Sequence, residues 1–125
     1  MPDLDAIAHV LCDSRTLLHE DREGVLWKIT EPGRQLDANL VRLAPDARVA
    51  HHAEPDLDVL LIVTEGGGVL ETPGAEDQGL DAGTVAWLPH GSARALRAGP
   101  DGLAYFTVHR RRPGMRIRTP PIRPL

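Results

Sequence analysis

The sequence predicts an all-β, antiparallel fold within one domain of ordinary size. Short β-prone runs follow one another, with clusters of turn residues between them. No segment of helical length and periodicity interrupts the series, which argues against a fold of alternating strands and helices. The composition, with 42% hydrophobic and 26% charged residues over 125 residues, is typical of a globular chain that buries a core.

Seven runs are predicted as strands, and each is bounded by Gly, Pro, Asp or Asn residues that favour turns. We expect the triple glycine at 66–68 to form a turn that ends the strand before it, and we expect a second turn at 98–102. The runs cover residues 25–30, 35–43, 58–64, 68–72, 84–89, 93–98 and 103–109.

The first residues differ from this pattern, because their apolar side chains repeat with the period of a helix. A short helix is therefore predicted over 4–11, with Asp3 as its cap. The expected organisation is a helix and lead-in segment at 1–20, a barrel at 21–110 and an Arg/Pro-rich tail at 111–125. The apolar face of the predicted helix consists of Leu4, Ile7, Ala8 and Leu11.

The run Val59–Val63 is apolar at every position, although an antiparallel strand with one wet face would alternate. Both faces of this strand are therefore expected to be covered, one by the barrel core and the other by a second sheet or a second subunit. The sequence accordingly predicts a homodimer.

Charge is distributed unevenly along the chain, whose overall net charge is −4. Residues 1–109 hold all 18 acidic and 8 basic residues, a net charge of −10, whereas 110–125 hold six arginines and no acid. Four prolines interrupt this basic tail, and the acidic body is its nearest partner. We expect the tail to lie on the protein's own surface, with no nucleic acid and no membrane as partner.

Cys12 is the single cysteine, which excludes an internal disulfide and a cysteine-based zinc site. The N-terminal residues have neither the basic region nor the long apolar stretch of a signal peptide. The expected location is the cytoplasm.

Two stretches carry a family resemblance: LAPDARVAHHAEPDLDVLLIVTEGGGVLE at 43–71 and LDAGTVAWLPHGSARAL at 80–96. Gly83, five further residues and then Pro89-His90-Gly91 match the framework of the second cupin motif, and Glu65-Gly66 match the end of the first. The chain thus resembles the cupin superfamily over about residues 25–110. The resemblance implies a double-stranded β-helix, or jelly-roll, barrel.

The family's metal is held by two His, one Glu and a later His, and the motif register places these four positions at His52, Glu54, Val59 and Arg94. His52 alone retains the family's residue type. Arg94 brings a permanent positive charge, which repels a cation. The resemblance therefore implies that the metal site is degenerate. No metal or other cofactor is favoured. We expect Glu54 and Arg94 to form an ion pair inside the barrel.

An alternative register keeps a metal site in view, with His51, His52, Glu54 and Asp58 as its ligands. A divalent Fe, Mn, Ni or Zn ion would then serve a metal-dependent enzyme of the dioxygenase, isomerase or decarboxylase type. The favoured hypothesis is different: the barrel pocket binds a small molecule, with an anion as one candidate. The residues expected to contact this ligand are His52, Glu54, Arg94, Trp87 and Tyr105.

Overall fold

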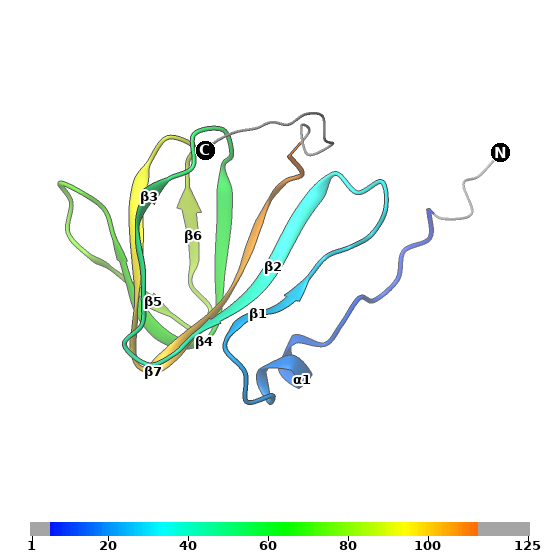
Figure 1. Ribbon diagram of the computed structural model, residues 1–125, viewed down its shortest axis with the longest axis horizontal. Helices are drawn as coiled ribbons and strands as arrows, with labels where there is room; N and C mark the ends of the chain where they lie inside the picture. The colour runs from blue at the N-terminus through cyan, green and yellow to red at the C-terminus, as the bar shows by residue number, and fades with distance from the viewer. Residues whose placement is uncertain (1–5, 113–125) are drawn as a thin grey trace, which may run out of the picture.

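The computed structural model describes residues 6–112, which form one short helix and seven strands. Within these residues, no helix has the length and apolar character needed to cross a membrane. The elements, labelled in Figure 1, are α1 (Ser14–Leu18), β1 (Gly24–Lys28), β2 (Leu36–Leu43), β3 (Arg48–Ala53), β4 (Val59–Glu71), β5 (Gln78–Asp81), β6 (Val85–Leu88) and β7 (Ala93–Arg110).

All strand pairs are antiparallel, and the two longest strands, β4 and β7, lie at the centre of the sheet. The order is β1-β2-β7-β4-β5, with β3 added to β7 and β6 added to β4. Figure 1 shows β3, β4, β6 and β7 curving around one interior, while β1 and β2 extend away from it. The predicted all-β jelly-roll fold is confirmed, although hydrogen bonds do not close the sheet into a complete barrel.

The core lies inside this curve and is built mainly from alternate residues of the central strands. Val59, Leu61 and Val63 of β4 are buried, while Leu60 between them is 37% exposed. The prediction that both faces of this strand are covered is therefore not met within a single chain. The buried cluster also contains Leu70, Leu80, Leu88, Leu96, Ala98, Leu103 and Tyr105.

The triple glycine does not form a turn, which corrects the sequence-based prediction. β4 continues through it, and its register against β7 shifts between Val63 and Glu65 and again between Gly66 and Gly68. At Gly66, φ is 75°, and a Cβ atom placed there would lie 2.2 Å from the carbonyl oxygen of Gly102. The glycines thus let two backbones approach closely at a bulge, where any side chain would force them apart.

The predicted turn at 98–102 is likewise part of a strand, because β7 runs without a break from residue 93 to 110. Two strands escaped prediction, β3 and β5. The β3 sequence RVAHHA has three polar residues and the β5 sequence QGLD contains a glycine, so neither has the apolar pattern of a buried strand. Pairing with the long central strands stabilises them instead.

The predicted N-terminal helix is wrong in position, because residues 6–13 are not helical and α1 begins at Ser14. Residues 4 and 5 lie outside the described range. Ile7 is 65% exposed and Leu11 is 44% exposed, so the apolar stripe finds no surface to bury it. Asp13 supplies the cap of the actual helix, since its side chain accepts a hydrogen bond of 2.9 Å from the Arg15 N–H.

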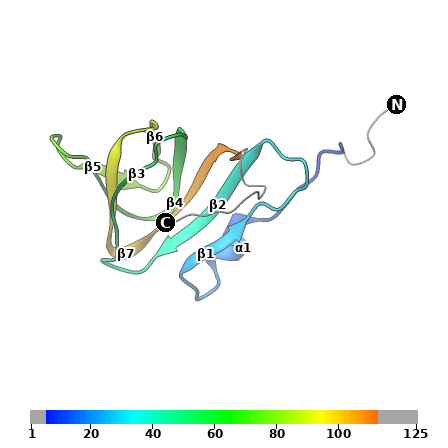
Figure 2. The ribbon, with the colours of Figure 1, turned by 45° about the horizontal axis from the view of Figure 1, so that its top comes forward.

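Arg42 of β2 attaches the helical lead-in to the sheet. Its guanidinium donates to the backbone oxygens of Leu18, Glu20 and Arg22 and to the Glu65 carboxylate. The Leu18 carbonyl at the end of α1 thereby gains a donor that the helix itself cannot supply. Figures 1 and 2 both show α1 beside β1, away from the barrel interior.

Candidate functional site

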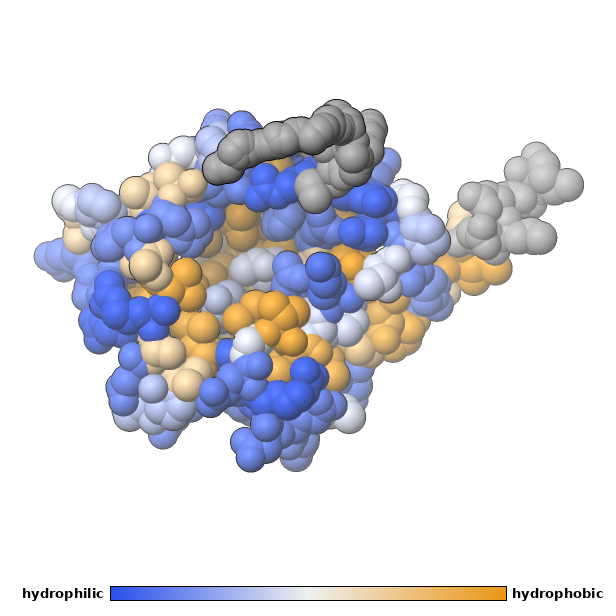
Figure 3. Space-filling view, in the orientation of Figure 1, coloured by the Kyte–Doolittle hydropathy of each residue, from blue (hydrophilic) through white to orange (hydrophobic). Residues whose placement is uncertain are grey.

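A cavity of about 390 Å³ opens inside the curve of the sheet. Its wall combines apolar side chains from β3, β4, β6 and β7 with a few polar groups, as is typical of small-molecule sites. In the space-filling view, hydrophobic residues lie in the recess and hydrophilic residues surround it (Figure 3). The apolar part of the wall consists of Val49, Ala53, Leu57, Val59, Leu61, Leu88 and Leu96.

Arg94 is the buried cation of this cavity. It lies one residue into β7 and is only 5% exposed. One guanidinium nitrogen, Nη1, donates to the backbone oxygen of Ser92 at 3.2 Å and to its hydroxyl at 3.3 Å. The Nε–H is buried and has no hydrogen-bond partner among the described residues. Burial lowers the pKa of Arg94 and the negative charge of Glu54 raises it, but an arginine stays protonated in either case.

His52 faces Arg94 across the β3–β7 pair, where the two residues are direct cross-strand partners. The register of β3 shifts between Val49 and His52, so the bulge residues Ala50 and His51 lie between the two positions that reach the cavity. His51 does not line the cavity. The sequence-based choice of His52 over His51 as the inward residue therefore agrees with the structure.

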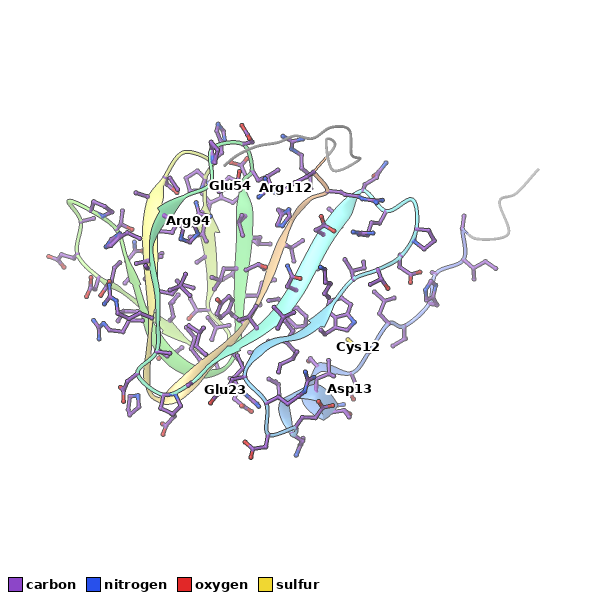
Figure 4. All side chains as sticks on the ribbon, viewed as in Figure 1. Cys12, Asp13, Glu23, Glu54, Arg94 and Arg112 are labelled. Atoms are coloured by element: carbon purple, nitrogen blue, oxygen red, sulfur yellow. The ribbon has the colours of Figure 1, made fainter. Side chains whose placement is uncertain are left out.

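Glu54 pairs with Arg112 and not with Arg94, which corrects the predicted ion pair. The Arg112 guanidinium donates to one Glu54 carboxylate oxygen, and the N–H of Asp56 donates to the other at 2.9 Å. The hydrogen bond from Arg112, followed by that from Asp56, lowers the pKa of Glu54. Figure 4 shows Glu54 and Arg112 at the same open end of the barrel, with Arg94 further inside. Arg94 thus keeps its charge without a carboxylate partner among residues 6–112.

Asp58 lies outside the cavity, directly before β4, and contacts His90 in the turn that follows β6. One of its carboxylate oxygens accepts hydrogen bonds from the His90 backbone N–H at 2.9 Å and interacts with the His90 ring nitrogen Nδ1 at 2.8 Å. These contacts lower the pKa of Asp58. The alternative ligand set of His51, His52, Glu54 and Asp58 is therefore wrong as a group, because only His52 and Glu54 line the same cavity.

The residues at the family's metal positions do not fit a divalent cation. Val59 offers no donor atom, Arg94 carries a positive charge, and Glu54 is engaged by Arg112. Within residues 6–112, no three His, Cys, Asp or Glu side chains converge in an arrangement that could hold a metal ion.

The two aromatic residues assigned to the cavity have different positions. Tyr105 of β7 lines it and is 5% exposed, and burial raises the pKa of its phenol to about 12, so the hydroxyl stays protonated. Trp87 does not line the cavity, which corrects the prediction. Side chains alternate along β6, so Leu88 points inward while Trp87 is 60% exposed on the outer face.

Three further polar residues of the cavity were not assigned a ligand role from the sequence: Thr107, His109 and Arg112. The first two follow Tyr105 at intervals of two, and strand alternation alone could have placed them on the same face. Arg112 comes after β7 ends, and no pattern in the sequence indicates that it returns to Glu54.

The basic tail enters the described part of the chain only with Arg111 and Arg112. Arg112 pairs with an acidic residue of the body, and Arg110, the last residue of β7, donates to the backbone oxygen of Asp56 at 3.2 Å. The predicted course of residues 113–125 lies outside the described residues.

Comparison with solved structures gives matches to cupin proteins. A cupin-like protein from Thermotoga maritima superposes with a TM-score of 0.56 and 28% identity, over 59% of this chain and 56% of its own. KdgF from a Halomonas species superposes with a TM-score of 0.56 and 27% identity, over 65% of this chain and 74% of its own. A cupin-2 domain protein from Shewanella frigidimarina superposes with a TM-score of 0.60 over 78% of this chain and 90% of its own. Its sequence identity is 18%, so this match shows likeness of fold alone. No protein-family model and no curated protein sequence matches the chain.

These likenesses agree with the motif framework, in which Gly83 has a positive φ of 94° in the turn before β6 and Gly91 one of 80° after it. The chain has a cupin-type fold, similar to the folds of these solved cupin proteins.

Proposed function

We propose that this protein binds a small organic carboxylate with an apolar body in its barrel cavity. The observation that carries the proposal is the buried guanidinium of Arg94, whose Nε–H has no partner among the described residues. An unpaired buried charge is unfavourable, and a bound carboxylate would remove this cost through charge-assisted hydrogen bonds.

The remainder of the wall defines the rest of the ligand. Apolar side chains make up most of it, so the part of the ligand that does not contact Arg94 is hydrocarbon. A volume of about 390 Å³ is at the lower end of the range for small-molecule sites, which indicates a compact ligand. His52, Thr107 and Tyr105 add groups that can hydrogen-bond to it.

The charge at the cavity mouth supports an anionic ligand. Glu54 would repel a carboxylate if it stood alone, but its ion pair with Arg112 offsets that charge. Arg94 therefore supplies the uncompensated charge of the cavity, and it is positive.

Calorimetric titration tests the proposal with matched pairs of acids and amides, such as benzoate with benzamide and butyrate with butyramide. The acids are expected to bind and the amides are not, because each amide has the same shape without the charge. Arg94→Met should weaken binding of the acid about 10- to 100-fold, the loss expected for a hydrogen-bonded charge. Arg97→Met is the control, since Arg97 lies on the same strand but pairs outside the cavity with Glu71 and Asp77. Equal affinity for acid and amide, or unchanged binding by Arg94→Met, would contradict the proposal.

We further propose that the outer face of β4 and β6 joins two copies of the chain in a homodimer. Trp87 and Val85 are each 60% exposed, and they pair across strands with Leu60 and Ile62. Elsewhere on the outer face of the sheet, the ring of Trp27 on β1 packs edge-on against the ring of Phe106 on β7, and the ring centroids are 6.1 Å apart. That part of the outer face is therefore covered by β1. The β4–β6 patch has no such cover within residues 6–112, and a contiguous exposed apolar patch favours association.

Light scattering coupled to size-exclusion chromatography checks the dimer. The native chain is expected at twice its mass of 13.6 kDa, and Trp87→Glu is expected to give a monomer. Val25→Glu is the control, because Val25 is 55% exposed on β1, outside the patch. A monomeric native chain at micromolar concentration would rule the dimer out.

A further inference from the structure

A second cleft, of about 310 Å³, lies beside the barrel cavity on the same face of the sheet. Asp37 pairs with His109 and Asn39 pairs with Thr107 across β2 and β7, so these β2 side chains share the face that bears the barrel cavity. In Figure 1 the cleft's elements are β1, β2 and the end of β7, where β2 extends away from the barrel. The cleft is lined by Lys28, Arg34, Asp37, Ala38, Asn39, His109, Arg111 and Arg112.

The lining of this cleft is strongly basic, and part of its charge is uncompensated. Arg34 pairs with Asp37 at 2.8 Å, and Arg112 pairs with Glu54. Lys28 and Arg111 have no carboxylate within ion-pair distance among residues 6–112. The four cations of the lining thus have two carboxylate partners, Asp37 in the cleft and Glu54 in the barrel cavity, which leaves a net charge of +2 at the cleft.

Two backbone and side-chain contacts hold the cations in place. The backbone N–H of Arg111 donates to the backbone oxygen of Gln35 at 2.8 Å, which fixes the chain where it leaves β7. The Arg34 guanidinium also donates to the backbone oxygen of Glu31 at 3.1 Å, so it is held by this contact and by its ion pair with Asp37. Like charges that line one cleft repel one another, and a bound anion offsets the repulsion.

We propose that this cleft binds the phosphate group of a phosphate monoester. A phosphate monoester carries nearly two negative charges at neutral pH, which match the net +2 of the cleft. Guanidinium groups donate in pairs to phosphate oxygens, Lys28 supplies a compact positive charge, and the Asn39 amide offers a further donor. A singly charged carboxylate or sulfate ester would leave one positive charge unmatched.

The cleft is a site separate from the one proposed inside the barrel. His109 and Arg112 line both cavities, but Arg94 lines only the barrel cavity, and Lys28 and Arg111 line only the cleft. Substitutions of these three residues therefore distinguish the two sites.

The test is a calorimetric titration of the full chain with phenyl phosphate, compared with phenyl sulfate as a singly charged ester. Phenyl phosphate is expected to bind at least tenfold more tightly than phenyl sulfate. The double variant Lys28→Gln/Arg111→Gln should lose at least tenfold in affinity for the phosphate. Both side chains belong to exposed residues, so the fold is expected to persist, and circular dichroism checks this.

The control is Arg15→Gln/Arg22→Gln, which removes the same charge at exposed residues outside the cleft. It should leave phosphate binding within twofold of the native value, and so should Arg94→Met. If the control weakens binding as much as the cleft variant, the effect is one of net charge and the proposal is wrong. Equal binding of phosphate and sulfate esters, or unchanged binding by the cleft variant, also overturns it. Failure of carboxylate binding in the barrel would leave these outcomes unaffected.

Discussion

Gly66→Ala is expected to destabilise the protein by about 4 kcal/mol, the largest effect of any single methyl group that we predict. An added Cβ would lie 2.2 Å from the carbonyl oxygen of Gly102, and that oxygen belongs to a backbone that cannot move alone. The φ of 75° adds strain for any residue with a side chain. Relief requires β4 and β7 to separate at the bulge, where both strands contribute to the core.

Two other glycines distinguish the two causes of destabilisation, which are the steric conflict of the added Cβ and the backbone strain at positive φ. Gly74 has a similar φ of 78° with open space around it, so Gly74→Ala measures the backbone strain alone, about 1 kcal/mol. Gly68 has no positive φ, but its Cβ would lie 2.3 Å from the Arg97 oxygen, so Gly68→Ala measures the steric conflict alone. Urea unfolding followed by tryptophan fluorescence gives the three free energies of unfolding. If Gly66→Ala falls within 1 kcal/mol of Gly74→Ala, the close approach of the strands does not have the energetic weight that we assign to it.

Arg94→Met is expected to stabilise the ligand-free protein by about 1–2 kcal/mol, the opposite of most substitutions of buried residues. The native guanidinium is 5% exposed, without a carboxylate partner among the described residues and with an unpaired Nε–H. Methionine fills similar volume without the charge. The expected gain in the free energy of unfolding is smaller than for removal of a fully buried charge. Arg94 borders an open cavity, from which water partly solvates its charge.

Thermal unfolding with and without a carboxylate ligand checks this prediction. Without ligand, Arg94→Met should unfold several degrees above the native protein, and Arg97→Met should not. Ligand at 100 times the native dissociation constant should raise the native stability by about 2.7 kcal/mol. It should raise that of Arg94→Met, which binds about 10- to 100-fold more weakly, by only about 0.4–1.4 kcal/mol, so the stability advantage of the variant shrinks or reverses. A loss of stability in ligand-free Arg94→Met would mean that the guanidinium holds the barrel together, and the inference of an anion site would lose its main support.

Local patterns in the sequence determined the fold class. Turn chemistry at Gly83, Pro89 and Gly91, together with the short β-prone runs, required only neighbouring residues and was sufficient to identify the cupin framework. The inward position of His52 and of Arg94 followed from the motif register. Strand alternation and positive φ are properties of a few consecutive residues, and such properties can be inferred before any tertiary contact is known.

Tertiary structure decided what the charges do and where the long strands continue. Glu54 and Arg112 are far apart in the chain, and their pairing depends on where the backbone goes after β7 ends. The triple glycine is locally as suitable for a turn as for a bulge, and contact with the Gly102 backbone decides for the bulge. Trp87 lies on the outer face because of the phase of β6, which its pairing with β4 fixes. These outcomes depend on non-local contacts, whose energies cannot be inferred from short stretches of sequence.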